Sequence, residues 1–152
     1  MSEYEALLRV VIAALLGGVI GYDRESRRRT AGLRTHMLVA LGAAAFTVVA
    51  IMITDHPALE DANVNIDPAR IIAGIITGIG FLGGAIVFRE GARPRNVTTA
   101  AGIWSVTGVG MAVGLGYYVL AVGVTALIIL VLSVLKLAEE RLSIRKEWPS
   151  DE

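Results

Sequence analysis

The sequence predicts an all-α membrane protein with five transmembrane helices. Two observations lead to this fold class. First, 55% of the 152 residues are hydrophobic and the mean hydropathy is +0.65, which is too apolar for a water-soluble domain of this size. Second, most of the charged residues and all four prolines separate apolar stretches of about 20 residues, the length that crosses a bilayer.

The first span contains Arg9, which lies close enough to the membrane surface to extend its charged group into water. The second and third spans each have an arginine in the first turn, Arg34 and Arg70. The stretch 97–135 has no charged residue or histidine and is long enough for a tight helical hairpin that turns at Gly114–Gly116. The predicted spans are about 4–22, 33–54, 69–88, 97–114 and 117–135, followed by a short charged tail, 136–152, all within one transmembrane domain, 1–152.

Five spans place every Lys and Arg except Arg9 and Arg70 on one side of the membrane. The positive-inside rule makes that side cytoplasmic, so the N-terminus is expected outside and the C-terminus inside. Residues 1–5 lack the basic region of a cleavable signal peptide, so the first span is expected in the mature protein.

The chain also repeats a short pattern. Gly17–Glu25 is echoed by Gly83–Glu90, and each leads into an arginine-bearing loop and then a helix that opens with threonine. Spans one and three run in the same direction, so the echo predicts a parallel repeat of helices 1–2 and 3–4.

Glycines four residues apart predict close helix packing, because both lie on one helix face and let backbones approach. Glycines on opposite faces of the third span predict a central helix, in which Gly80→Leu would disrupt folding. Packing within one chain is favoured, with a homodimer as the alternative. The predicted packing glycines are Gly17, Gly21, Gly74, Gly78, Gly80, Gly84, Gly110 and Gly114.

Polar residues gather at the predicted cytoplasmic ends of the first four spans, and we call this set the collar. One interpretation is a Mg²⁺ site formed by Asp23, Glu25 and Glu90, because Mg²⁺ prefers a few oxygen ligands. Each acid has an arginine beside it, however, which favours an ion-pair network that joins the two hairpins. The arginines at 27–29 are expected to contact anionic lipids.

Several function classes are excluded or disfavoured. The absence of Cys removes thiolate nucleophiles and cysteine metal sites, and His36 and His56 are far apart in sequence, so we expect no enzyme. We expect no cofactor other than Mg²⁺. Fourteen basic residues balance 14 acidic ones, so no nucleic-acid binding is expected. No charge lies in the middle of any span, which leaves no proton relay. The polar groups that remain there are the hydroxyls of Thr47, Thr77, Ser105 and Thr107.

An ordered set of motifs resembles the MgtC/SapB family of bacterial inner-membrane proteins, some of them associated with virulence. The motifs are Gly21–Glu25, Ala31–His36, Gly78–Gly84, Arg89–Gly91 and Thr98–Trp104. The resemblance implies a multi-pass inner-membrane protein with a regulatory role in magnesium homeostasis and low-magnesium stress, exerted on a membrane partner such as ATP synthase. The alternatives are a transporter or channel for Mg²⁺ or another small solute, and a structural oligomer on anionic lipids.

The resemblance assigns the collar to positions that match the family's polar motif residues. The chain departs from the family pattern at Asn96-Val97, where Gly-Leu is common, and at Asp23, where Glu is common. It also stops before the cytoplasmic C-terminal domain of longer members. Trp104 matches the pattern and is expected to pack inside the bundle. The collar residues are Asp23, Arg24, Arg34, Thr35, Arg89, Glu90, Thr98 and Thr99.

Overall fold

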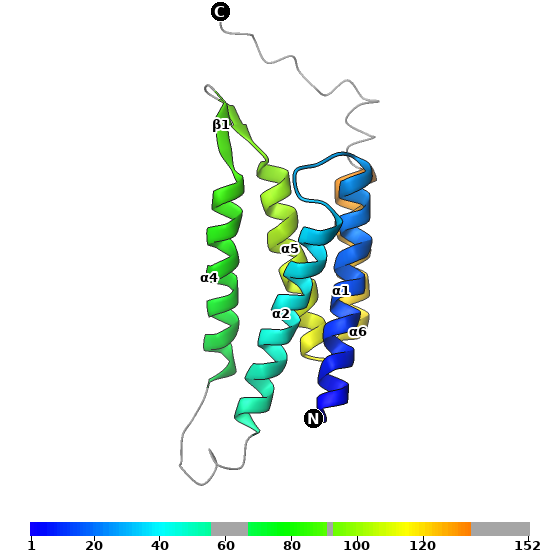
Figure 1. The fold of residues 1–152 in the computed structure, drawn as a ribbon, viewed down its shortest axis with the longest axis vertical. Helices are drawn as coiled ribbons and strands as arrows, with labels where there is room; N and C mark the ends of the chain where they lie inside the picture. The colour runs from blue at the N-terminus through cyan, green and yellow to red at the C-terminus, as the bar shows by residue number, and fades with distance from the viewer. Residues whose placement is uncertain (56–66, 91–92, 135–152) are drawn as a thin grey trace, which may run out of the picture.

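The structure is a computed structural model that describes residues 1–55, 67–90 and 93–134. Five α-helices stand side by side and alternate in direction (Figure 1). A short antiparallel pair of strands extends beyond the helix ends, where the sequence predicted only a loop. The elements are α1 (Glu3–Ser26), α2 (Leu33–Thr54), α4 (Pro68–Ile86), β1 (Phe88–Glu90), β2 (Arg93–Arg95), α5 (Val97–Gly114), α6 (Tyr118–Ile129) and the π-helical turn η1 (Leu130–Val134).

Four of these helices are long and apolar enough to cross a membrane: Glu3–Ser26, Leu33–Thr54, Ala69–Ile86 and Val97–Gly114. The predicted fifth span corresponds to α6 together with η1, an apolar helix that is shorter than the other four. The described residues therefore support a multi-pass helical membrane protein. The fifth crossing, the orientation and the parallel repeat stay predictions.

The first span is longer than predicted. Helix α1 continues to Ser26 and includes Asp23, Arg24 and Glu25, which were placed in a loop. No Pro or Gly interrupts the helix after Gly21, and Asp23 pairs with Arg27 one turn later at 2.9 Å. Pairs of opposite charge four residues apart stabilise a helix. The charged residues after Gly21 therefore continue α1 instead of ending it.

Local sequence explains where α1 and α4 begin. The Ser2 hydroxyl accepts a hydrogen bond from the backbone N–H of Glu5, and the Asp67 carboxylate accepts one from Ala69. Both are side-chain caps for the free N–H groups of a first helical turn. Pro68 follows Asp67 in the first turn of α4. Backbone N–H groups there have no partner within the helix, so a proline at this position loses no hydrogen bond.

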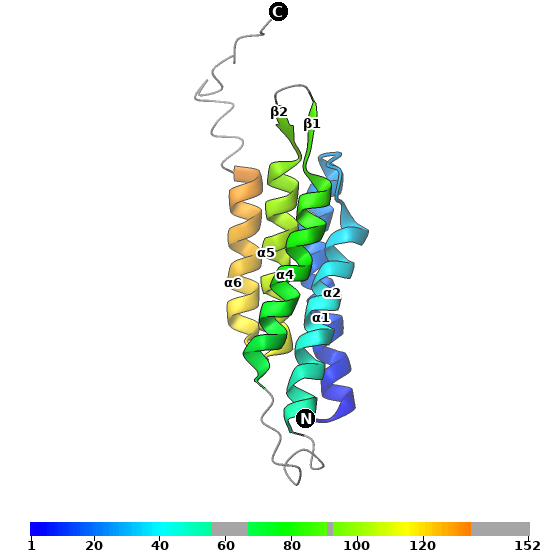
Figure 2. The same cartoon turned by 90° about the vertical axis from the view of Figure 1, so that its left-hand side faces the viewer.

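The central helix is α5, and the prediction that the third span is central is wrong. Of the residues in α5, 56% are buried, against 11% in the α4 segment Ala69–Ile86. Helix α5 packs against all four other helices. Figure 1 shows α4 at one edge of the bundle, and in Figure 2, where that side faces the viewer, α4 lies in front of the other helices.

Small side chains fill the core between α1, α2, α5 and α6, so these backbones lie close together. Ala13, Ala40 and Ala44 are fully or almost fully buried and pack with valines of α5. Close approach of this kind drives helix association in lipid, where apolar side chains gain nothing by leaving water.

Glycines bring α1 and α5 against α2. A Cβ atom on Gly17 would lie 2.6 Å from the His36 carbonyl oxygen, and one on Gly21 would lie 2.7 Å from Leu33 Cα. A Cβ on Gly110 would overlap the Ala40 carbonyl oxygen, and one on Gly114 would lie 2.8 Å from Thr47 Cβ. No larger residue fits at these four positions without movement of the helices.

The remaining predicted packing glycines have no such neighbour. Around each of them, no atom outside the local helix backbone lies within 4 Å of where a Cβ would be. Their helix lies at the edge of the bundle, and all four positions border open space rather than a closely packed neighbouring helix. A contact role for them stays a prediction that needs a partner from outside the described part of this chain. These glycines are Gly74, Gly78, Gly80 and Gly84.

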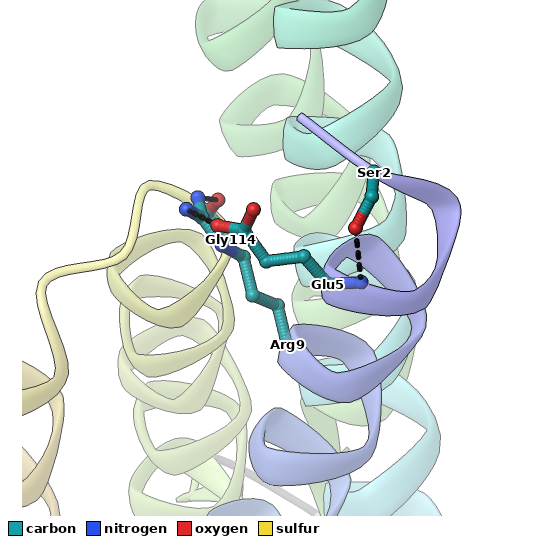
Figure 3. Close-up of polar contacts among 4 residues, drawn as sticks. All are labelled: Ser2, Glu5, Arg9 and Gly114. Atoms are coloured by element: carbon teal, nitrogen blue, oxygen red, sulfur yellow. Dashed lines mark hydrogen bonds and ion pairs between the residues drawn. The ribbon is translucent and has the colours of Figure 1, made fainter.

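Arg9 joins the start of α1 to the end of α5 (Figure 3). One guanidinium nitrogen donates to the Gly114 carbonyl oxygen at 2.7 Å, and another pairs with Glu5 on the preceding turn. The carbonyl groups of a last helical turn lack partners within the helix, so the arginine supplies one. Arg9 therefore binds protein, where the sequence suggested a charged group extended into water.

Candidate functional site

The charged end of the bundle is the end at which α1 and α4 finish and α2 and α5 begin (Figure 1). It brings together the last turn of α1, the first turn of α2 and the start of α5, as the collar prediction required. Arg89 and Glu90 lie on β1 at the same end, but their side chains are outside the part of the molecule that the structure describes.

Arg24 is the buried centre of this site, with only 3% of its surface exposed. It lies on the helix face that carries Gly17 and Gly21, which turns it toward the neighbouring helices. Its Nη2 donates to the Thr99 hydroxyl at 3.0 Å, and its Nε has no hydrogen-bond partner among the described residues. Arg24 thus links the first helical hairpin to α5.

The Asp23 carboxylate connects α1 to the end of the apolar region. Its Oδ1 accepts hydrogen bonds from Arg27 Nε at 2.9 Å and from the Ser133 hydroxyl at 2.8 Å. Ser133 belongs to η1, so this contact joins the last described turn of the chain to the first helix.

Glu25 caps α2 from outside that helix. Its Oε2 accepts a hydrogen bond from the backbone N–H of Leu33 at 2.7 Å. The usual capping position is Gly32, which has no side chain to do this, and a Cβ there would lie 2.7 Å from the same carboxylate oxygen. The loop must therefore have glycine at 32 for Glu25 to reach the helix.

These contacts bear on the predicted Mg²⁺ ligands. Asp23 and Glu25 each accept hydrogen bonds that occupy one of their carboxylate oxygens. In the described ranges, no three His, Cys, Asp or Glu side chains gather closely enough to hold a metal ion. The third predicted ligand, Glu90, falls outside the described side chains, so the metal site stays a prediction.

His36 is completely buried beside Arg24, and its importance was not predicted from the sequence. Its Nδ1 donates to the Gly32 carbonyl oxygen at 2.9 Å, one turn back in α2. Its Nε2 has no partner among the described residues and faces Gly102, where a Cβ would lie 3.8 Å away. The imidazole ring therefore lies within ordinary contact distance of α5 at Gly102.

Asn96 connects three segments at the same end. Its amide donates to the Ile86 carbonyl oxygen at 3.4 Å, and its side-chain oxygen accepts from the Thr30 hydroxyl at 3.0 Å. Its φ angle of 63° is left-handed, a conformation that Gly adopts freely and Asn tolerates better than most residues. Asn is therefore well suited to position 96.

Other collar residues face outward. Arg34 and Thr98 are exposed, and Thr35 is half-buried. Trp104 is 56% exposed on α5, so the expectation that it packs inside the bundle is wrong for this chain alone. The charged end therefore has a buried part that joins helices and an exposed part that is free to meet other molecules.

Hydroxyl groups farther from the charged end form hydrogen bonds within their own helices. Each donates to the carbonyl oxygen four residues earlier in its own helix, at 2.7–3.0 Å. This bonding is common for Ser and Thr in membrane helices. The residues are Thr47, Thr77, Ser105, Thr107 and Thr125.

Similarity to known proteins agrees with the motifs at this site. Protein MgtC of Salmonella typhimurium is 38% identical over 94% of this chain and 58% of its own length. The putative magnesium transporter YhiD of Escherichia coli is 36% identical over 86% of this chain and 60% of its own. Protein slr0014 of Synechocystis is 41% identical over 78% of this chain and 47% of its own.

The chain thus spans about half to three-fifths of the length of these relatives. No solved structure matches it. The MgtC family matches residues 10–141, a range that covers most of the described helices and the whole charged end. The chain therefore belongs to the MgtC family.

Proposed function

We propose that this chain is a non-enzymatic regulator of magnesium homeostasis that acts on another protein in a bacterial inner membrane. Family membership supports a magnesium-related role, since one relative is named a putative magnesium transporter. The arginines of the charged end support its placement at the cytoplasmic face by the positive-inside rule.

The bonding and charge of the buried polar groups favour regulation over transport. The middle of each described helix has no carboxylate, and the buried hydroxyls there each donate to their own helix, so nothing in the described bundle supplies a negative charge to a passing cation. The buried ionised group at the charged end is Arg24, a cation that repels Mg²⁺ at short range. A pathway for Mg²⁺ through the bundle would need negatively charged groups along it instead of a buried arginine.

A surface on α5 supports contact with a partner helix. Trp104 is largely exposed although it lies on the central helix, and Gly108, one turn later, has open space where a Cβ would be. Exposed tryptophans often dominate the energy of protein interfaces, and glycine lets a second backbone approach. The membrane ATP synthase is the first partner to test, since the family resemblance implies it.

The test separates partner binding from loss of folding. A photo-crosslinking amino acid at position 104 should capture a membrane protein in cells grown at low magnesium, and Trp104→Ala should abolish the growth effect of the chain at normal expression. Val119 is 90% exposed on α6 and provides a matched control position. Equal capture at positions 104 and 119, or full activity of Trp104→Ala, contradicts the proposal.

Transport of Mg²⁺ is the second candidate, supported by the name of the Escherichia coli relative. Liposomes that contain folded protein and an internal Mg²⁺ indicator decide between the two. We expect uptake no faster than in protein-free liposomes. Uptake above that background that is lost in Glu90→Ala would establish transport with the collar at its entrance.

A further inference from the structure

A long groove lies between α2 and α4, the two helices that lie side by side in Figure 2. Its volume is about 840 Å³. It runs from Leu38 to Ile53 along α2 and from Ile71 to Leu82 along α4. Both helices are candidate membrane spans, so the groove lies at the depth of the bilayer.

Glycines, which have no side chain, create this groove. Gly42 on α2 and Gly74 and Gly78 on α4 all line it, and a Cβ on any of them would meet nothing within 4 Å. Almost all of the other lining residues are apolar. The exception is Thr107 on its floor, whose hydroxyl is already bonded to the Ile103 carbonyl oxygen. The groove therefore suits an occupant without polar groups.

The volume of the groove decides which apolar occupant fits inside it. The segment from Leu38 to Ile53 is about 22 Å long at 1.5 Å per residue. A helix of that length, about 10–12 Å wide with its side chains, occupies roughly 2,000 Å³. This is more than twice the groove volume of about 840 Å³, so such a helix does not lie fully inside the groove. An extended hydrocarbon chain does.

The two ends of the groove differ in charge. Arg34 lies one turn before Leu38 on the same face of α2, is exposed, and makes no ion pair with any residue that the structure describes. The N-terminus of α2 already has the Glu25 carboxylate at the Leu33 N–H, so Arg34 is the group at this end that remains available to a further anion. At the other end, exposed Asp55 and Asp67 accompany Arg70. An anionic group is therefore favoured at Arg34.

We propose that this groove is a binding site for one anionic phospholipid, with an acyl chain between α2 and α4 and the headgroup phosphate at Arg34. The site differs from general contact with the bilayer, because it combines an apolar groove between two helices with a charge at one mouth. It does not depend on whether the protein regulates or transports.

The first experiment measures lipid retention. Protein is purified in a mild detergent, exposed to phosphatidylglycerol, and analysed by native mass spectrometry. We expect one tightly held lipid in the unmodified chain and at least tenfold less in Gly78→Phe, whose side chain fills the groove. Gly80→Phe is the matched control, since Gly80 also has open space around it but does not line the groove.

Equal retention by the unmodified chain and Gly78→Phe overturns the proposal. A stable dimer that Gly78→Phe dissociates also overturns it, because the occupant would then be a second copy. Thermal unfolding of both variants without lipid should resemble that of the unmodified protein, which separates loss of the site from loss of the fold.

The second experiment locates the headgroup. Arg34→Gln should weaken phosphatidylglycerol binding about fivefold, the value expected for one arginine at an anionic membrane surface. Arg70→Gln, at the opposite mouth, should leave it unchanged. An effect of Arg70→Gln with none of Arg34→Gln would overturn the proposed placement.

Discussion

The two helical hairpins, α1–α2 and α4–α5, differ in how they use their glycines. In α1–α2, Gly17 and Gly21 bring the backbones into direct contact. In α4–α5, a Cβ on Gly83 would make only an ordinary contact with Ala100 at 3.9 Å, and the other glycines of α4 meet nothing within 4 Å. Gly110 and Gly114 of α5 contact α2 instead. The hairpins share a sequence pattern, but the close contacts join α2 to its two neighbours.

This difference shows that spacing and contact are separate properties. Glycines four residues apart create a narrow strip along a helix, and whether that strip is covered depends on which helix lies beside it. Helix α2 has neighbours against two of its faces, whereas α4 lies at the edge of the bundle. The uncovered strip on α4 forms one wall of the groove that we assign to a lipid.

The largest expected effect is in the first hairpin. Gly17→Leu would place side-chain atoms against the His36 carbonyl group and Ala40, and backbone cannot move aside cheaply. We expect a loss of about 3 kcal/mol or more in the free energy of unfolding, and a low yield of folded protein. Unfolding by SDS, followed by circular dichroism, measures this. A stability equal to that of the unmodified chain would refute the close contact of α1 and α2.

The link from the first hairpin to α5 comes next. Thr99→Val removes the hydroxyl that accepts the hydrogen bond from Arg24 Nη2, so this buried donor is left without a partner. The free energy of unfolding should fall by about 1–3 kcal/mol. The same unfolding assay applies. Arg24→Met in that background should restore most of the loss, because an apolar side chain needs no partner. A double variant no more stable than Thr99→Val would contradict this role for Arg24.

A smaller effect is expected at the cap of α2. Glu25→Ala removes the acceptor of the Leu33 N–H and should lower stability by about 1 kcal/mol. Glu25→Gln keeps an acceptor oxygen and should lose less. Hydrogen exchange at the Leu33 amide should accelerate most in Glu25→Ala, and equal exchange in the three proteins would exclude the cap.

The smallest effect is expected in the second hairpin. Gly80→Leu should change stability by no more than about 0.5 kcal/mol, because a side chain there enters open space. This reverses the expectation from sequence, which made the third span central. A loss comparable to that of Gly17→Leu would show that the strip on α4 is covered by a partner in the assayed protein.

For the part of the chain that the structure describes, the sequence predicted the type and approximate bounds of the helices, because long apolar stretches bounded by charge and Pro admit few alternatives. It could not predict that α1 continues through Asp23 and Glu25, since charged residues are compatible with helix and with loop. It also misplaced the centre of the bundle. Glycine counts favoured α4, whereas fully buried Val106 and Val109 place α5 there.

The candidate site was predicted in part. The sequence placed Arg24 and Thr99 at one end of the bundle, since α1 must finish where α5 begins. It could not predict that Glu25 caps α2, because that contact depends on the path of the loop. The left-handed conformation of Asn96 could have been predicted from the resemblance, which has Gly at this position, because Gly is the residue that adopts a positive φ most freely.

The bonds of Arg9 and Asp23 have a consequence for biosynthesis. Arg9 meets Gly114, which is 105 residues later, and Asp23 meets Ser133, which is 110 residues later. At about 5–20 residues per second, the ribosome needs about 5–20 s to make either partner. During that interval the first helix lacks these partners within the chain. These two contacts of the first helix are completed only after α5 and then η1 have been made, so both form late in the synthesis of the described helices.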